Sequence, residues 1–247
     1  FIVYFQTFFF SFCDYDDDHL IINNFQFLSN PQNIPKVFTE SYFQEFKGYY
    51  RPLITLSYMI DTLINGINPF VFHLSNILYH LIVCCLLFIF FLKLEIKKEF
   101  SLILSSIFAI HPLLVQTVVW IPGRNDSILA LFFLLSSIFL LNFIRTEKKK
   151  WLIFHFISFA LSLISKETAL ILPVIFICYI AIFPKAKRYL SRIVLFAPIW
   201  LMIILTWFLV RKYSAESSII SSLKFFKSFT EFITAFVIYI GKMLLPF

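Results

Sequence analysis

Residues 69–92 read PFVFHLSNILYHLIVCCLLFIFFL, and this stretch decides the class of fold. It contains no Asp, Glu, Lys or Arg, and as a helix it would extend about 36 Å at 1.5 Å per residue. That length crosses the ~30 Å hydrocarbon core of a bilayer. The stretch therefore predicts a transmembrane helix.

The composition of the whole chain agrees with this prediction. Of its 247 residues, 60% are hydrophobic and 14% are charged, against about 25% charged residues in soluble domains. So few polar side chains cannot cover a water-soluble surface, and the apolar residues come in continuous runs rather than in alternating segments. We therefore predict an all-α fold, a polytopic bundle of about eight transmembrane helices.

Eight apolar runs are candidates for these helices. The predicted spans are residues 1–13, 69–92, 100–119, 127–144, 151–164, 168–183, 191–210 and 228–247. Residues 53–64 are too few to span and include Asp61, so we predict a short amphipathic helix at the interface, within a first outer loop of about 14–68. Because apolar runs reach both ends of the sequence, we expect residues 1–247 to be a fragment of one membrane-embedded domain, truncated at both ends.

The positive charges predict which connections face the cytoplasm. Three connections, 93–99, 145–150 and 184–192, hold 11 Lys and Arg in 22 residues, and the opposite set holds 9 in 67. Short cytoplasmic connections retain Lys and Arg, so the loop 14–68 is predicted to lie outside. The net charge of +7 then reflects membrane topology, and these short loops offer no nucleic-acid-binding surface.

The densest polar feature is the run DYDDDH at 14–19, at the start of the outer loop. Carboxylates this close repel one another, which raises the pKa of at least one and suits it to accept a proton near neutral pH. We interpret the run as a general base or a divalent-cation site at Asp16, Asp17 and Asp18, with a solvated acidic loop as the alternative. The apolar residues 20–22 keep it near the membrane surface.

Cations gather at other helix ends on the same predicted side. They are Arg51 before Pro52, Arg124 in the turn 123–126, and Lys166 beside Glu167. A lipid-linked phosphate lies at this depth, and cations beside a carboxylate suit a phosphate leaving group and a hydroxyl nucleophile. Taken alone, each cation has a second interpretation, as an anchor of a span at the interface.

Polar residues also occur inside the predicted spans. His73, Asn76 and His80 share one helical face, which suits either hydrogen bonds between helices or the lining of a cavity. His111 precedes Pro112 in the middle of the next span, where we predict a structural kink rather than a catalytic histidine. The sequence has no HExxH motif, no glycine-rich phosphate loop and no nucleophile elbow, so soluble hydrolase and nucleotide-binding functions have no support.

Taken together, these motifs resemble a known family. They are YDD at 15–17, YRPL at 50–53, NP at 68–69, HP at 111–112 and SKE at 165–167. In this order they are similar to motifs of the polytopic GT-C glycosyltransferases, in particular the transmembrane, tetratricopeptide-containing protein O-mannosyltransferases and their bacterial relatives. The resemblance runs over essentially the whole chain.

The resemblance implies a function and a site. It implies transfer of a sugar, such as mannose, from a polyprenyl-phosphate donor to a hydroxyl of a protein Ser or Thr or of a glycan, on the non-cytoplasmic face. Asp16 and Asp17 map onto the catalytic acidic motif of that family, and our candidates for binding the donor phosphate are Arg51, Arg124 and Lys166. The residues expected to line or support the cavity are Asp18, His73, Asn76, His80, His111, Asp126 and Glu167. The only cofactor considered is a divalent cation at the acidic run.

A second hypothesis is a membrane protein without transferase activity, either a transporter or an inactive scaffold relative. The polar face of residues 73–80 would then line a permeation path. A transporter often shows two related halves, and the sequence has no convincing internal repeat. Under either hypothesis we expect a multi-pass protein of the bacterial inner membrane or, in a eukaryote, of the endoplasmic reticulum membrane.

Overall fold

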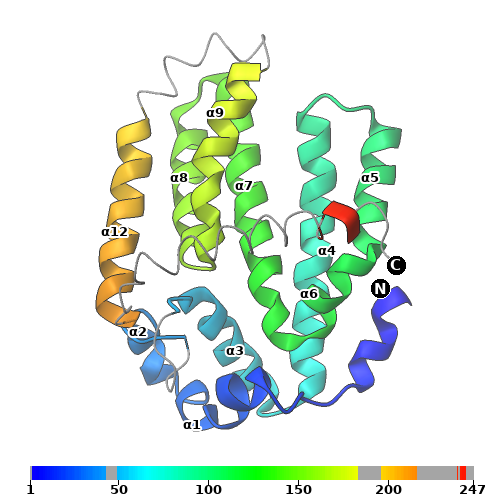
Figure 1. The fold of residues 1–247 in the computed structure, drawn as a ribbon, viewed down its shortest axis with the longest axis vertical. Coiled ribbons are helices and arrows are strands. Elements are labelled where there is room, and N and C mark those ends of the chain that lie inside the picture. Colours follow the sequence, from blue (N-terminus) through cyan, green and yellow to red (C-terminus); the bar gives the residue numbers. More distant parts are fainter. Residues whose placement is uncertain (1, 43–48, 183–195, 216–237, 239, 243–247) are drawn as a thin grey trace.

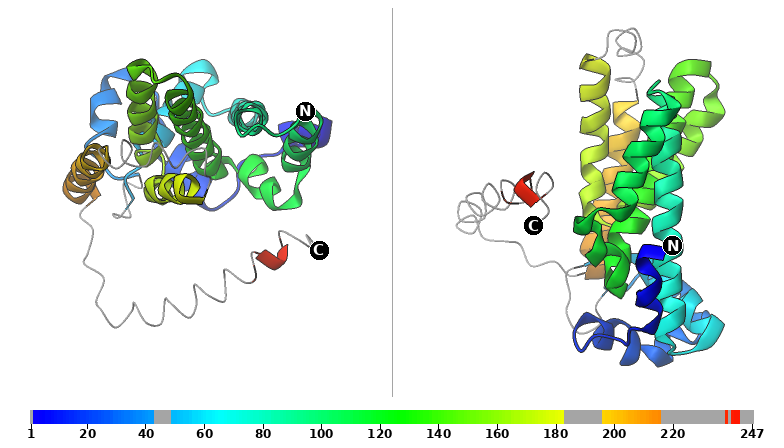
Figure 2. Two further views of the ribbon diagram at one scale, coloured as in Figure 1. Left: turned by 90° about the horizontal axis from the view of Figure 1, so that it is seen from above. Right: turned by 90° about the vertical axis from the view of Figure 1, so that its right-hand side faces the viewer.

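The structure is a computed structural model, and it describes residues 2–42, 49–182, 196–215, 238 and 240–242. Within these ranges every regular element is a helix and none is a strand, which confirms the predicted helical class. Long helices run side by side, and an N-terminal segment of short helices lies across their lower ends (Figure 1). The side view in Figure 2 shows the same arrangement.

The bundle is made of helices from Pro69 onward. They are α4 (Pro69–Lys93), α5 (Lys98–Ile110), α6 (Val115–Val119), α7 (Arg124–Thr146), α8 (Lys149–Leu163), α9 (Leu172–Ile182) and α12 (Ala197–Ala215). The most extensive packing joins α7 to α8 and α4 to α7, so α7 is the central helix. The other elements are η1 (Ile2–Phe9), η2 (Asp18–Ile22), α1 (Phe25–Leu28), η3 (Pro31–Asn33), α2 (Ile34–Val37), α3 (Pro52–Asn65), η4 (Pro112–Leu114), η5 (Ile121–Gly123) and η6 (Glu167–Ile171).

The local sequence sets where α4 begins. Asn68 has extended backbone and accepts the N–H of Phe70 on its Oδ1 at 3.1 Å, and Pro69 occupies the first helical position. A capping Asn followed by Pro is a strong start signal, because the side chain satisfies a free N–H and Pro has none to satisfy. The helix predicted at 69–92 is therefore confirmed.

The predicted span 100–119 is broken in the middle. Helix α5 ends at Ile110, and the helical path resumes at Pro112 after a bend of 52°. His111 lies at the break and accepts the backbone N–H of Leu113 on its Nδ1 at 3.3 Å. The kink predicted at His111 and Pro112 is confirmed, and the ring of His111 caps the segment that follows.

Gly123 permits the tight turn from α6 into α7. A Cβ atom at this position would lie 2.6 Å from the carbonyl oxygen of Gln116 and 2.9 Å from the Cα of Thr117. Only glycine tolerates backbone this close. The chain therefore reverses directly, and residues 124–126 begin α7 at the lower end of the bundle (Figure 1).

Two helices, Pro69–Lys93 and Ile121–Thr146, are long and apolar enough to cross a membrane, and the bent pair of α5 with Pro112–Val119 is a third candidate. This supports a membrane protein but does not establish eight spans. The predicted spans 151–164, 168–183 and 191–210 overlap α8, α9 and α12, which have 15, 11 and 19 residues.

The predicted spans at the two ends of the sequence, 1–13 and 228–247, have no matching long helix in the described residues. The predicted span 1–13 contains only η1, whose 8 residues are too few to cross a bilayer. Because this span is predicted only as a truncated piece, a crossing there stays a prediction. The predicted span 228–247 lies almost wholly outside the described residues.

Apolar contacts fasten the N-terminal segment to the bundle. Leu20, Ile21 and Leu28 are at most 2% exposed and belong to one core with Tyr58 of α3 and Phe72 of α4. Burial of each such side chain is worth about 1.5–3 kcal/mol. The acidic run, which immediately precedes Leu20, is thereby held against the lower ends of the long helices.

Candidate active site

The acidic run lies in the turn that leads into η2. Asp17 is 1% exposed, and its Oδ2 accepts the backbone N–H of Cys13 at 2.8 Å. Its other oxygen, Oδ1, is buried and has no hydrogen-bond partner among the described residues. Asp16 and Asp18 are half-buried. Because a buried carboxylate oxygen without a donor is costly, Oδ1 is a candidate contact for a ligand.

Burial raises the pKa of Asp17, and the carboxylates of Asp16 and Asp18 add to the rise. The N–H of Cys13 and the charge of Arg124 act in the opposite direction, but the net shift is upward. Burial also raises the pKa of Asp16. The sequence predicts such a rise from repulsion between carboxylates, whereas removal from water is the larger cause. A carboxylate with a raised pKa is suited to accept a proton.

Arg124 lies in the protein interior. Its side chain is 0% exposed, and its guanidinium donates to Asp61 Oδ2 at 2.6 Å, Asn76 Oδ1 at 2.8 Å, the carbonyl of Phe72 at 2.9 Å and Ser57 Oγ at 3.1 Å. Four of its five N–H groups therefore have protein partners. These contacts differ from the phosphate-binding role expected from the sequence, and we assign Arg124 to the core.

Asp61 is the residue whose role the sequence analysis misses. It is 1% exposed, and its second oxygen accepts the hydroxyl of Ser75 at 2.5 Å. In the sequence Asp61 only argues against a span at 53–64, where the structure has the helix α3. A carboxylate within an apolar helix needs a buried cation, and this rule applied to Asp61 and Arg124 together would have paired them.

The polar residues of α4 have separate partners. Asn76 donates through Nδ2 to three backbone carbonyls in the segment 118–121, at 3.0–3.2 Å. His80 Nε2 lies 3.0 Å from the carbonyl oxygen of Ala109. The sequence allows two roles for these residues, hydrogen bonds between helices or the lining of a cavity. Asn76 and His80 make hydrogen bonds to neighbouring segments of the bundle. His73 is 2% exposed, and its ring packs edge-on against that of Phe10 at 6.3 Å between the ring centres.

Arg51 and Glu167, far apart in sequence, form an ion pair of 3.0 Å between Nη2 and Oε1. The Arg51 guanidinium lies over the ring of Tyr49 at 4.8 Å and over that of Tyr42 at 5.6 Å. Its Nε is buried and has no hydrogen-bond partner in the described ranges. Burial alone would raise the pKa of Glu167, but the charge of Arg51 holds it below its usual value. Glu167 and the two tyrosine rings thus hold the Arg51 side chain in place, and its carboxylate partner does not use all five N–H groups of the guanidinium.

Lys166 and Asp126 form a second ion pair beside the first, between Nζ and Oδ1. The Lys166 side chain is 22% exposed and that of Asp126 is 51% exposed. Lys166 directly precedes Glu167, and Asp126 lies in the first turn of α7. The two ion pairs therefore bring together four of the predicted site residues from three distant parts of the chain.

Two tyrosines connect the surface ion pairs to the buried arginine. The hydroxyl groups of Tyr42 and Tyr58 lie 3.1 Å apart. Arg51 lies over the ring of Tyr42, and Arg124 lies over the ring of Tyr58 at 4.7 Å. The charge of Arg124 opposes the rise in the pKa of Asp17, and the charge of Asp17 adds to the raised pKa of Tyr58. The acidic run and the Arg51 ion pair thus lie on either side of Tyr42 and Tyr58, at the lower end of the bundle. His80 and His111 lie apart from these tyrosines, at the contact with Ala109 and at the bend after α5.

In the described part of the chain, no group of three or more His, Cys, Asp or Glu side chains is arranged to hold a metal ion. The structure therefore adds no support to the divalent-cation site expected at Asp16, Asp17 and Asp18.

These features define a class of protein: a helical membrane protein with a buried carboxylate and two ion pairs at one end of its bundle. Residues 52–220 match the family of dolichyl-phosphate-mannose-protein mannosyltransferases, and the chain belongs to this family. The resemblance to glycosyltransferases of the O-mannosyltransferase type, stated from the motifs, is thereby confirmed.

Curated relatives agree with this assignment. Protein O-mannosyl-transferase TMTC2 of Mus musculus is 33% identical over 144 residues, which is 54% of this chain and 16% of the relative. The Homo sapiens TMTC2 protein is 34% identical over 145 residues with the same shares. Protein O-mannosyl-transferase TMTC1 of Homo sapiens is 35% identical over 88 residues, 35% of this chain and 10% of the relative.

The chain spans only a small part of these relatives, 16% of the length of TMTC2. No solved structure matches the chain.

Proposed function

We propose that the protein containing this chain is a multi-pass glycosyltransferase of the endoplasmic reticulum membrane, or of the inner membrane if it is bacterial. It transfers mannose from a polyprenyl-phosphate donor to the hydroxyl of a protein Ser or Thr on the non-cytoplasmic face. The name of the relatives, protein O-mannosyl-transferase, supports the sugar and the acceptor class. The observation that carries the proposal is the buried, unpartnered oxygen of Asp17 at the same end of the bundle as the cations Arg51 and Lys166.

The reaction needs a base and a stabilised leaving group. Asp17, through Oδ1, takes the proton of the acceptor hydroxyl as its oxygen attacks the anomeric carbon of the sugar. The bond between that carbon and the phosphate oxygen breaks, and the phosphate leaves with the electron pair. Arg51 and Lys166 then stabilise the phosphate through the N–H groups that their carboxylate partners leave unused. Asp16, beside the base, supports the same proton transfer.

Access to Asp17 requires a local opening. The backbone of Cys13 lies against its carboxylate, and residues 10–13 belong to no helix. Displacement of this segment by an acceptor breaks the hydrogen bond from the Cys13 N–H to Asp17 and leaves the long helices intact. Movement of residues 10–13 away from Asp17 exposes Oδ1 to the acceptor hydroxyl. When these residues return, water is again excluded from Oδ1.

An apolar cavity of about 270 Å³, lined in part by the sequence neighbour of Arg51, supports a lipid donor. Its walls come from α8 and α12, with Leu163 and Trp207 among the lining residues, and Tyr50 closes one side. Because Tyr50 directly precedes Arg51, a chain lying in this cavity would bring its phosphate end to the Arg51 guanidinium. We therefore assign the cavity to the first part of the polyprenyl chain.

Substitution of Arg51 tests the donor site. With the full-length protein in lipid nanodiscs and polyprenyl-phosphate mannose as donor, Arg51→Gln is expected to lower kcat/KM for transfer to a Ser/Thr peptide about tenfold to a hundredfold, because a charge-assisted contact to the leaving phosphate is lost. The matched control is Arg145→Gln, which removes an exposed arginine paired with Glu95 at the opposite end of the bundle. Equal rates in both variants, or solute flux without sugar transfer in the wild type, would contradict the proposal.

The pH dependence of transfer tests the base. Asp17 accepts a proton only when ionised, so the rate is expected to fall as the pH drops through its raised pKa, above the range of an ordinary aspartate. Asp18→Asn removes a negative charge that raises the pKa of Asp17, and should therefore move the acid limb of the kcat profile to lower pH. Asp14→Asn is the control, because Asp14 does not contribute to that shift. An acid limb that stays in place in Asp18→Asn argues against Asp17.

A further inference from the structure

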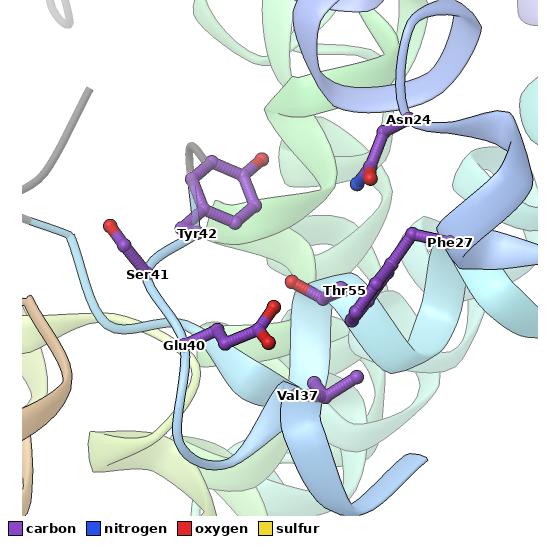
Figure 3. Close-up of a pocket in the computed structure, with 7 residues that line it drawn as sticks. All are labelled: Asn24, Phe27, Val37, Glu40, Ser41, Tyr42 and Thr55. Carbon is purple, nitrogen blue, oxygen red and sulfur yellow. The ribbon is translucent and has the colours of Figure 1, made fainter. Parts of the chain in front are cut away.

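A small polar cavity lies in the N-terminal segment, apart from the acidic run and the ion pairs. We name it the Asn24 niche, and its lining residues are Asn24, Phe27, Val37, Glu40, Ser41, Tyr42 and Thr55 (Figure 3). They come from α1, α2, α3 and the adjoining turns. Its volume is about 10 Å³, which is room for one water molecule or one hydroxyl group.

The niche contains an unsatisfied acceptor. Asn24 is 9% exposed, and its Oδ1 is buried without a hydrogen-bond partner in the part of the chain that the structure describes. Figure 3 shows the Asn24 amide, the Thr55 hydroxyl and the Glu40 carboxylate directed toward one space. A buried amide oxygen of this kind destabilises the folded state when no donor reaches it. The niche therefore has room and an acceptor for a group that brings a hydrogen-bond donor.

The chemistry of the walls favours a hydroxyl that is attached to carbon. A hydroxyl donates once and accepts twice, so it can donate to Asn24 or Glu40 and accept from the Thr55 hydroxyl. The ring of Phe27 and the methyl groups of Val37 line the same space and are suited to contact the carbon that carries the hydroxyl. A water molecule would also satisfy the polar atoms, but unlike a carbon-bound hydroxyl it would make no apolar contact with Phe27 and Val37.

One side chain joins the niche to the proposed phosphate site. Tyr42 lines the niche, and the guanidinium of Arg51 lies 5.6 Å from the centre of the Tyr42 ring. Tyr42 is therefore a neighbour of both the niche and Arg51. A hexose whose anomeric phosphate is bound by Arg51 would reach the niche by lying alongside the Tyr42 side chain.

We propose that the Asn24 niche binds one hydroxyl of the transferred sugar and so selects the sugar of the donor. This inference rests on the proposed function and deepens it. Asn24 and Thr55 supply the hydrogen bonds, and Phe27 supplies the apolar contact. A donor that lacks the matching hydroxyl leaves Asn24 Oδ1 buried and unpaired, which is how a hydrogen-bonding site rejects a deoxy analogue.

The test uses the full-length protein in nanodiscs with polyprenyl-phosphate mannose and its monodeoxy analogues. In the wild type, one analogue is expected to lose about tenfold to a hundredfold in kcat/KM relative to the native donor. In Asn24→Leu the native donor falls to the level of that analogue, so the discrimination disappears. Thr55→Val, which keeps the side-chain shape, is expected to reduce the same discrimination. The matched control Asn23→Leu changes the exposed neighbouring asparagine and should preserve it.

The outcomes separate this inference from the proposed function. If both niche variants slow all donors equally, the niche holds an ordered water only and the inference is wrong, although transfer itself stands. A competition assay compares binding of polyprenyl-phosphate mannose with that of polyprenyl phosphate alone. If the sugar adds affinity that Asn24→Leu removes, but the wild type transfers nothing, the proposed function fails and the niche stands. If the sugar adds no affinity in the wild type, the niche proposal is overturned.

Discussion

The Asp17→Asn variant is expected to lose about 10²–10⁴-fold in kcat for sugar transfer, with donor binding little changed. The substitution keeps an oxygen that accepts the N–H of Cys13 and replaces the unpartnered Oδ1 by an amide that cannot take a proton. Steady-state transfer from polyprenyl-phosphate mannose to a Ser/Thr peptide measures the loss. The Asp16→Asn variant shows whether the neighbouring carboxylate takes over.

The same substitution is expected to stabilise the fold, which distinguishes a lost base from a damaged structure. Because the pKa of Asp17 is raised on folding, the folded state favours the protonated carboxyl. The stability from this group is therefore fully present below the unfolded-state pKa and is lost as the pH rises through the folded-state pKa. At neutral pH the ionised carboxylate costs stability, and Asn removes that cost. Thermal unfolding at pH 7 should give Asp17→Asn a Tm at or above that of the wild type.

A different result would remove the acidic run from the mechanism. If the double variant Asp16→Asn, Asp17→Asn transfers sugar at the wild-type rate, neither carboxylate is the base. If Asp17→Asn loses both activity and stability, its role is to hold the turn through Cys13, and the unpartnered oxygen has no catalytic meaning.

Local signals in the sequence predict much of the fold. Asn68 and Pro69 fix the start of α4, and the pair His111 and Pro112 breaks the next helix as expected. The charge pattern predicts connections at two opposite ends. In Figure 1 the connections after α4 and α7 lie at the upper end and the N-terminal segment lies at the lower end. Which end faces the cytoplasm stays a prediction.

The site is harder to predict, because its contacts join distant residues. Arg124 and Lys166 carry the same signal in sequence, a cation near a helix end. Only the three-dimensional packing shows that Arg124 is enclosed by Asp61 and Asn76 while Lys166 remains partly exposed. The Asn24 niche has no sequence signal at all, since its lining residues become neighbours only when α1, α2 and α3 pack together.

The pair of Asp61 and Arg124 carries the largest expected effect on stability. Arg124→Met leaves Asp61 buried without its cation, and we expect this to cost about 3–5 kcal/mol and to lower the Tm by roughly 10 °C. Thermal unfolding of the full-length protein in nanodiscs measures the change. Arg145→Met is the control, because Arg145 is 41% exposed in its pair with Glu95 and such surface pairs contribute little.

The double variant decides whether the loss comes from an unpaired charge. Asp61→Leu alone leaves Arg124 buried and unpaired, whereas Asp61→Leu with Arg124→Met removes both charges and places apolar side chains in the space. Since the cost of each single change is mainly an uncompensated buried charge, the double variant is expected to lose clearly less stability than the sum of the two single variants. Strict additivity would mean that the two side chains stabilise the fold independently, through Ser75 and Asn76 rather than through each other.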